Sequence, residues 1–215
     1  MGAKEMKRFM ILIGIALVLA GCTNQGSSET GQAQEENDGH KASSFSLVVK
    51  PAKLSNREKT LVNQIGVDYQ TFFTVDGKVP EGEALISSIE VYENGKMINE
   101  ITTQSTAEEN SKYKNALHSF QVRMGEEMND LTIGGPDGYV AGQAEQPKDL
   151  KAFLFEHPEE RVTLNKGETI YWAYVIGSSQ SQLSTRGTEN LKTLPPSIKN
   201  EDYAIVFKME LNEEK

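Results

Sequence analysis

Residues 168–177 read ETIYWAYVIG, and they are the most informative stretch of the chain. Both alternating series of this stretch are apolar: Ile170, Trp172, Tyr174 and Ile176 form one, and Tyr171, Ala173 and Val175 form the other. Since successive side chains of a strand point to opposite faces, neither face of this segment would be polar. Such a pattern is typical of a strand covered on both sides. We therefore expect a central strand here, with Trp172 in a core.

Alternation with a period of two recurs elsewhere between turn residues, and it indicates half-buried strands. The inward series are Phe45, Leu47 and Val49; then Val67, Tyr69, Thr71, Phe73 and Val75; and finally Tyr203, Ile205, Phe207, Met209 and Leu211. Lys208 and Glu210 alternate with the last series. We therefore expect an exposed back face on the closing strand.

Two turns predict hairpins. Asn94-Gly95 lies in the middle of the run 85–101, and this dipeptide suits the positive φ angles of a type I′ turn. The turn 165–167, Asn-Lys-Gly, separates the short run 161–164 from the central strand, which predicts a second hairpin.

Helix is scarce in this sequence. Ser55 and Glu58 have capping-box spacing, and Gly66 lies where a C-terminal cap would fall, so a short helix is expected between them. Residues 147–156 suit either a second helix or a strand. Seven to nine strands with one or two short helices predict a mainly β fold, an antiparallel β-sandwich of the immunoglobulin-like kind.

The first residues have the zones of an export signal. Lys4, Lys7 and Arg8 outweigh Glu5, and the eleven residues 9–19, FMILIGIALVL, carry no charge. That run is long enough for a signal-peptide core but shorter than the roughly 20 residues that span a bilayer. A cleaved signal is therefore favoured over a permanent transmembrane helix.

The residues that follow, Leu19-Ala20-Gly21-Cys22, resemble the lipobox of bacterial lipoprotein precursors. The resemblance implies a diacylglycerol group on the Cys22 thiol, cleavage before Cys22, and acylation of the new amino group with a chain such as palmitate. In its lipobox, its Lys/Glu/Asn-rich composition and its single cysteine, the chain is similar to small lipoproteins of Gram-positive bacteria. The resemblance implies a signal peptide at 1–21 and a lipidated cysteine with its linker at 22–44. The rest of the chain, 45–213, is then expected to form one sandwich domain.

Residues 23–44 contain no aromatic or branched aliphatic side chain, so they predict a disordered tether with a root-mean-square span of about 26 Å. Without residues 1–21 the chain loses three of its 22 basic and one of its 31 acidic residues, leaving a formal net charge near −11. Such acidity disfavours nucleic acid as a partner and disfavours an electrostatic contact with anionic lipid. The membrane is expected as a partner through the lipid anchor alone.

Metal and cofactor motifs are absent from the sequence. The histidines are His40, His118 and His157, none of them paired at ligand spacing, and we predict no metal site and no cofactor. His118 alternates with Phe120 and Val122, so it is expected to face inward. A sharper hypothesis joins His118, Met124 and Met128 as soft ligands for Cu(I).

No residue is predicted to be catalytic, because lipidation consumes Cys22 and no nucleophile motif such as GxSxG appears. Two polar stretches remain, predicted to be loops that either connect strands or bind a ligand. Their candidate binding residues are Asp137 and Tyr139 in 131–146, and Gln180, Gln182 and Arg186 in 177–187.

The expected function is that of a membrane-anchored, extracytoplasmic lipoprotein, a non-enzymatic binding or adaptor module of the cell envelope. Its loops would contact an envelope protein or a soluble ligand. The alternative is an envelope hydrolase or metal-handling lipoprotein, which requires His118, His157 or the acidic residues to converge in one cleft.

Overall fold

The computed structural model describes residues 46–105, 112–183 and 190–213, all within one compact unit, Lys41–Lys215. Cys22, His40, Phe45 and Arg186 lie outside the described residues.

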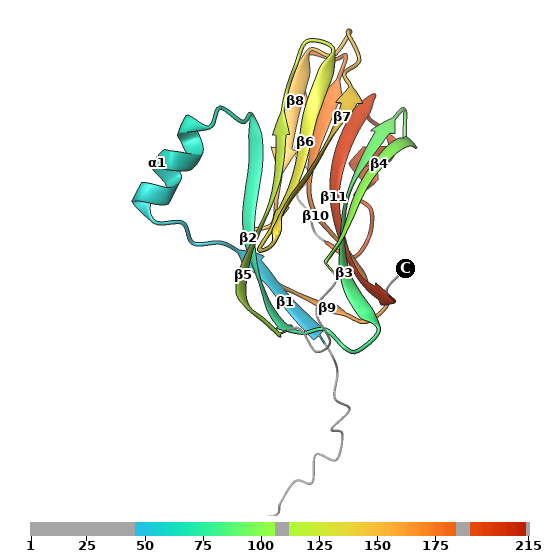
Figure 1. Cartoon of the computed structure of the whole chain (residues 1–215). Coiled ribbons are helices and arrows are strands. Elements are labelled where there is room, and N and C mark those ends of the chain that lie inside the picture. Colours follow the sequence, from blue (N-terminus) through green and yellow to red (C-terminus); the bar gives the residue numbers. More distant parts are fainter. Residues whose placement is uncertain (1–45, 106–111, 184–189, 214–215) are drawn as a thin grey trace, which may run out of the picture. The chain divides into compact units, whose positions relative to one another are not determined.

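Two antiparallel sheets pack face to face as a sandwich, which confirms the predicted fold class and is compatible with an immunoglobulin-like arrangement (Figure 1). Sheet A contains, in spatial order, β7 (Gly138–Glu145), β6 (Met128–Gly135), β5 (Lys112–Arg123), β2 (Tyr69–Lys78), β1 (Ser46–Pro51) and β9 (Val162–Asn165). Sheet B contains β4 (Lys96–Ser105), β3 (Glu83–Glu93), β11 (Tyr203–Glu213), β10 (Thr169–Ser178) and β8 (Ala152–Glu156). The helical elements are α1 (Asn56–Gln64) and the short 3-10 helix η1 (Pro196–Lys199).

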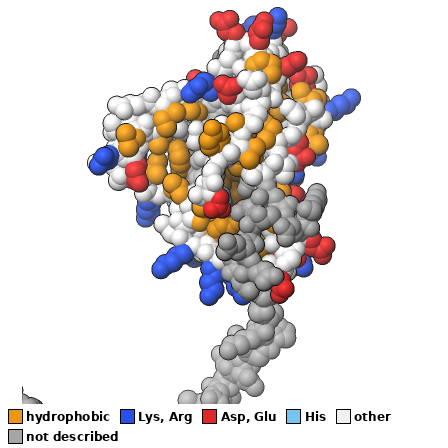
Figure 2. Space-filling model, viewed as in Figure 1, with side chains coloured by type: hydrophobic (Ala, Val, Ile, Leu, Met, Phe, Trp, Pro, Cys, Tyr) orange, Lys and Arg blue, Asp and Glu red, His pale blue; other side chains and the backbone are white. Residues whose placement is uncertain are grey.

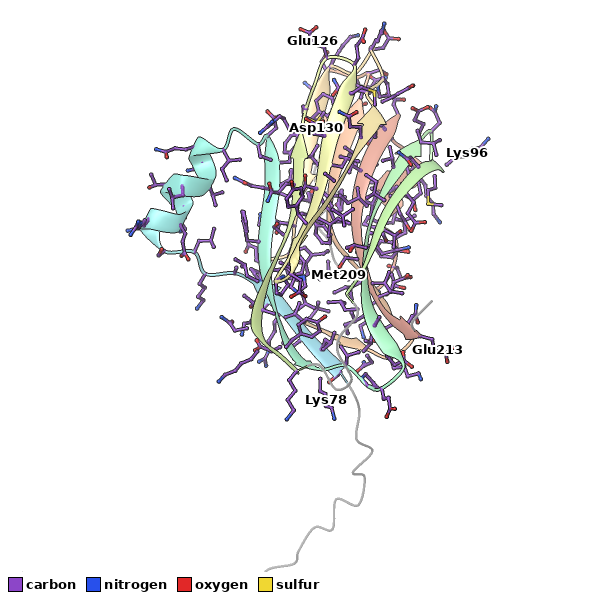
Figure 3. All side chains as sticks on the ribbon, in the orientation of Figure 1. Lys78, Lys96, Glu126, Asp130, Met209 and Glu213 are labelled. Atoms are coloured by element: carbon purple, nitrogen blue, oxygen red, sulfur yellow. The ribbon has the colours of Figure 1, made fainter. Side chains whose placement is uncertain are left out.

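The core lies between the sheets and is built from the alternating series expected from the sequence. In β1, β2 and β11 alternate side chains, among them Val49, Phe73 and Phe207, are buried between the two sheets. Met209 points between the sheets, whereas Lys78, Lys96 and Glu126 point into solvent (Figure 3). Two buried hydrogen bonds also join the sheets, from Trp172 Nε1 to Thr71 Oγ1 (3.3 Å) and from Asn129 Nδ2 to Tyr203 Oη (3.1 Å).

A β-bulge changes the faces of the central strand β10. Its register with β11 shifts between Tyr171 and Ala173. As a result, Ile170 and Trp172 face the inter-sheet core, but further along the strand Ala173 and Val175 do. Tyr174 and Ile176 belong instead to a second apolar cluster on the outer side of sheet B. The strand is covered on both faces, as predicted. The bulge, however, makes the residues that face the core change from one alternating series to the other.

The outer side of sheet B corrects the expectation of an exposed back face on the closing strand. Ala204 and Val206 of β11 are fully buried under Ile198 of η1, in the second apolar cluster. Further along, Lys208 forms an ion pair with the buried Glu90 of β3, and it is itself largely covered. The segment around η1 therefore covers the outer side of β11, and the alternation within β11 alone does not predict this cover.

Of the two predicted hairpins, one is confirmed and one is wrong. Asn94 and Gly95 have φ angles of 49° and 73° and join β3 to β4 in a tight turn, as a type I′ turn requires. The turn at Asn165–Gly167 exists, but β9 pairs with β1 in sheet A while β10 pairs in sheet B. The chain therefore crosses between the sheets at this turn.

Two other segments hold more strand than expected, which raises the number of described strands to eleven. Residues 152–156 form strand β8, the second of the two alternatives left open. The predicted loop 131–146 is wrong, because it lies in the β6–β7 hairpin with its turn at Pro136–Asp137. Its glycines and polar residues pair as strands because the partner strand and β5 satisfy their backbone groups.

The capping box that Ser55 and Glu58 predict is present at the start of α1. The Glu58 carboxylate accepts from the Ser55 N–H (2.6 Å), and the Glu58 N–H donates to Ser55 Oγ (3.3 Å). No residue of α1 is buried, and the helix stands to one side of β2, where Figure 2 shows hydrophobic side chains at the surface (Figures 1 and 2). None of the helices that the structure describes is long and apolar enough to cross a membrane.

Because α1 makes no buried contact, changes on it should hardly affect stability. Leu61 and Ile65 are each 54% exposed, so replacing either with serine is expected to change the free energy of unfolding by about 0.5 kcal/mol or less. Urea unfolding followed by circular dichroism measures this. A loss above about 2 kcal/mol would instead show that α1 is held against the sandwich in solution.

Candidate functional site

The edge strands of the two sheets meet on one side of the sandwich. β7 is the edge of sheet A and β4 the edge of sheet B, and Asn99 Nδ2 of β4 donates to the backbone oxygen of Gln143 in β7 (3.3 Å). The approach is close, because a Cβ added at Gly142 would overlap the Ile101 side chain. Glycine at position 142 therefore permits this contact between the edges.

A cavity of about 240 Å³ lies beside this contact, between the β6–β7 turn and sheet B. Its walls come from both sheets: Ser87 and Thr103 from β3 and β4, His118 from β5, and Ile133 to Val140 from the hairpin. The lining mixes hydroxyl, imidazole, carboxylate and aliphatic groups. It can therefore accept a small group that is partly apolar and partly hydrogen-bonding.

His118 is the most unusual side chain of this cavity. It is 5% exposed, and its ring stacks on Phe73 at 5.5 Å between centroids and lies 5.9 Å from Tyr113. Its Nε2 atom is buried and has no hydrogen-bond partner. Buried polar atoms are nearly always hydrogen-bonded, and leaving one unpaired costs about 1–3 kcal/mol. His118 therefore combines a place in the lining of the cavity with an unsatisfied buried nitrogen.

The imidazole of His118 is uncharged at neutral pH. Burial lowers its pKa to about 4, and the nearby Asp137 carboxylate opposes that shift only in part. A neutral ring has one donor and one acceptor nitrogen. It can therefore form a hydrogen bond with a neutral polar group and needs no anionic ligand.

The structure brings together only some of the predicted binding residues. Asp137 and Tyr139 line the cavity, and Tyr139 is 77% exposed beside its mouth. Gln180 and Gln182 do not line it; they follow β10 near Asp202, whose carboxylate accepts from the Ser179 N–H (2.7 Å). The two predicted stretches therefore do not form one site.

The sequence does not single out Ser87 and Thr103. It predicts that His118 faces inward, and the alternative hypotheses place His118 in a Cu(I) site or a hydrolase cleft. Ser87 and Thr103 are register partners in the β3–β4 hairpin, and Thr residues are common in strands of many kinds. Only the packing of this hairpin against β6 and β7 gives them a place in a site.

The hydrolase alternative has a partial counterpart here, because Ser87, His118 and Asp137 line the same cavity. A nucleophile needs a hydrogen bond to its base, yet Nε2 of His118 has no partner. An imidazole with a pKa of about 4 is also a weak general base at neutral pH. His157 follows β8, which is the edge of sheet B opposite β4, and it does not line the cavity.

The metal hypotheses gain no support from the geometry. Met124 lies six residues beyond His118 on an extended chain, which separates them by about 20 Å, and Met128 is 39% exposed. Within the described ranges, no three His, Cys, Asp or Glu side chains are placed to hold a metal ion.

A second hollow of about 510 Å³ lies between the segment before α1 and the outer face of sheet A. Lys50, Lys53, Glu58 and Leu117 are among its lining residues, and Thr74 Oγ1 is buried there without a partner. None of the predicted binding residues reaches this hollow. We therefore take the His118 cavity as the candidate site.

The family model described as the YgaN domain matches residues 48–211, from β1 to β11, and so spans the whole sandwich. The searches of curated proteins and of solved structures found no match.

Proposed function

This chain belongs to the YgaN domain family, and we propose that it is a lipid-anchored, extracytoplasmic binding module of the cell envelope whose ligand occupies the His118 cavity. The observation that carries the binding role is a cavity lined by His118, whose buried Nε2 has no hydrogen-bond partner. The anchor rests on the lipobox-like residues 19–22 and the charge-free run before them. The role is non-enzymatic.

The anchor is tested by replacing Cys22 with alanine. Two acyl chains stabilise membrane attachment by about 0.8 kcal/mol per buried methylene, so their loss is expected to release most of the protein from the membrane fraction. Cell fractionation with labelled palmitate measures both attachment and acylation. Ser27→Ala, a linker change that keeps the cysteine, is expected to behave like the wild type. An alanine form that remains membrane-bound after signal cleavage contradicts the anchor.

The binding role is tested in whole cells with a photo-crosslinking residue at position 139. Tyr139 borders the cavity and is largely exposed, so a ligand bound there is expected to be captured. His118→Phe removes the unpaired nitrogen and is expected to abolish the capture. The same crosslinker at position 182, which does not line the cavity, serves as the control. Equal capture from both positions contradicts the site.

A further inference from the structure

Among the strands that the structure describes, none pairs with the outer edge of β7, and some backbone groups of β7 are directed away from the sheet. In antiparallel pairs, residues alternate between those bonded to the partner strand and those whose N–H and C=O point outward. The bond from Gln146 N to Glu127 O (2.9 Å) places the bonded positions of β7 at 138, 140, 142 and 144. The backbone groups of Tyr139, Ala141 and Gln143 therefore point outward, and the contact of Asn99 with the Gln143 oxygen agrees with this.

This edge lacks the usual protection against pairing. Natural edge strands carry charges, prolines or bulges, or are very short. Residues 138–144 read GYVAGQA, without a charge or a proline, and β7 is eight residues long. By contrast, β9 has four residues and β8 has five, and β4 carries Lys96 and Glu100. Among the described sheet edges, β7 is the one best suited to accept another strand.

The cavity opens beside the free part of that edge. β4 and β7 touch at Asn99 and Gln143, whereas Thr103 and Val140 line the cavity further along the same two strands. A chain paired with β7 at Tyr139 and Ala141 therefore passes over the cavity. Side chains of a strand alternate, so such a chain can direct one of them inward.

The size and chemistry of the cavity suit one such side chain. Its volume of about 240 Å³ is below the roughly 300–1,000 Å³ of sites for drug-sized ligands. The residues that line it include His118, Ser87, Thr103, Ile133 and Val140. A medium-sized side chain with a hydrogen-bonding group would match this mixed lining.

We propose that the ligand is an extended peptide segment of a partner protein, which adds a strand to β7 at Tyr139–Ala141 and places one hydrogen-bonding side chain in the cavity beside the His118 ring. This rests on the proposed function and specifies the ligand of the same cavity. Backbone pairing supplies most of the affinity and the cavity supplies selectivity, as in other strand-addition complexes.

The test is selection of binders from a phage-displayed library of random decapeptides on the full chain in detergent. Enriched peptides are expected to share one position rich in Ser, Thr, Asn or Gln, and to slow amide hydrogen exchange at Tyr139 and Ala141. Ala141→Pro removes only an outward N–H, which edge strands tolerate, and is expected to weaken binding at least tenfold. His118→Phe is expected to do the same, and Gln182→Ala is the matched control. Circular dichroism verifies that each variant is folded.

The outcomes separate the two proposals. Binding that survives Ala141→Pro but not His118→Phe overturns strand addition and leaves the cavity as the site. Binding that survives both changes overturns both proposals, and a library without enriched peptides overturns the peptide ligand. Light scattering tests whether a second copy of this chain pairs with β7. A dimer that Ala141→Pro dissociates would show such pairing and would overturn the peptide ligand.

Discussion

Replacing Trp172 with alanine is expected to lower the free energy of unfolding by about 3–5 kcal/mol, the largest effect of any single truncation proposed for this domain. Trp172 is fully buried in β10, its ring lies 5.2 Å from that of Phe73 in the opposite sheet, and its Nε1 donates to Thr71 Oγ1. Alanine leaves a cavity between the sheets and an unpaired buried hydroxyl on Thr71. Urea unfolding followed by circular dichroism measures the loss.

Trp172→Phe separates these two contributions. Phenylalanine retains aromatic packing against Phe73 but cannot donate to Thr71, so a smaller loss of about 1–2 kcal/mol is expected. If alanine and phenylalanine cost the same, the hydrogen bond would dominate and the packing account would be wrong.

The second large effect is the contribution of His118 to the dependence of stability on pH. Its pKa is about 4 in the folded chain, against an ordinary value near 6.5, because burial disfavours the charged ring. The unfolded chain therefore takes up a proton first as the pH falls. The stability that the neutral ring provides is fully present above pH 6.5 and is lost as the pH falls towards 4. The loss over this window is about 3 kcal/mol.

The His118→Phe variant isolates this contribution. It keeps the aromatic contact with Phe73 and has no titrating group, so its stability should fall less between pH 6.5 and 4 than that of the wild type. Carboxylates such as Asp76, whose pKa is lowered by its bond to Lys50, also lose stabilisation in acid, but equally in both proteins. Unfolding midpoints at several pH values provide the measurement. Parallel curves for the two proteins would show that His118 is not buried as a neutral ring.

The local elements of the fold follow from short stretches of sequence. The alternating series in β1, β2 and β11, the Asn94-Gly95 turn and the Ser55–Glu58 capping box are all found where they were expected. Each depends on hydrogen bonds or steric limits between residues close in sequence, so a single segment contains enough information.

The predictions are wrong for elements that depend on a partner distant in sequence. The crossing between β9 and β10 resembles a hairpin locally, because the turn at 165–167 has the same chemistry in either case. The bulge in β10 changes which residues face the core, since its pairing with β11 shifts by one residue there. The 131–146 stretch was taken as a loop because its glycines and polar residues are poor strand formers until β5 and the hairpin partner fix them.

The candidate site also depends on contacts between residues far apart in the sequence. Asp137, Tyr139 and His118 were each noted in the sequence for a different reason, and Ser87 and Thr103 were not noted at all. By itself the sequence determined a mainly β sandwich with a tryptophan in its core, because alternation is carried by neighbouring residues. Only the tertiary structure decided that β4 and β7 meet and that a cavity with an unpaired imidazole opens beside them, since these contacts join strands far apart in the chain.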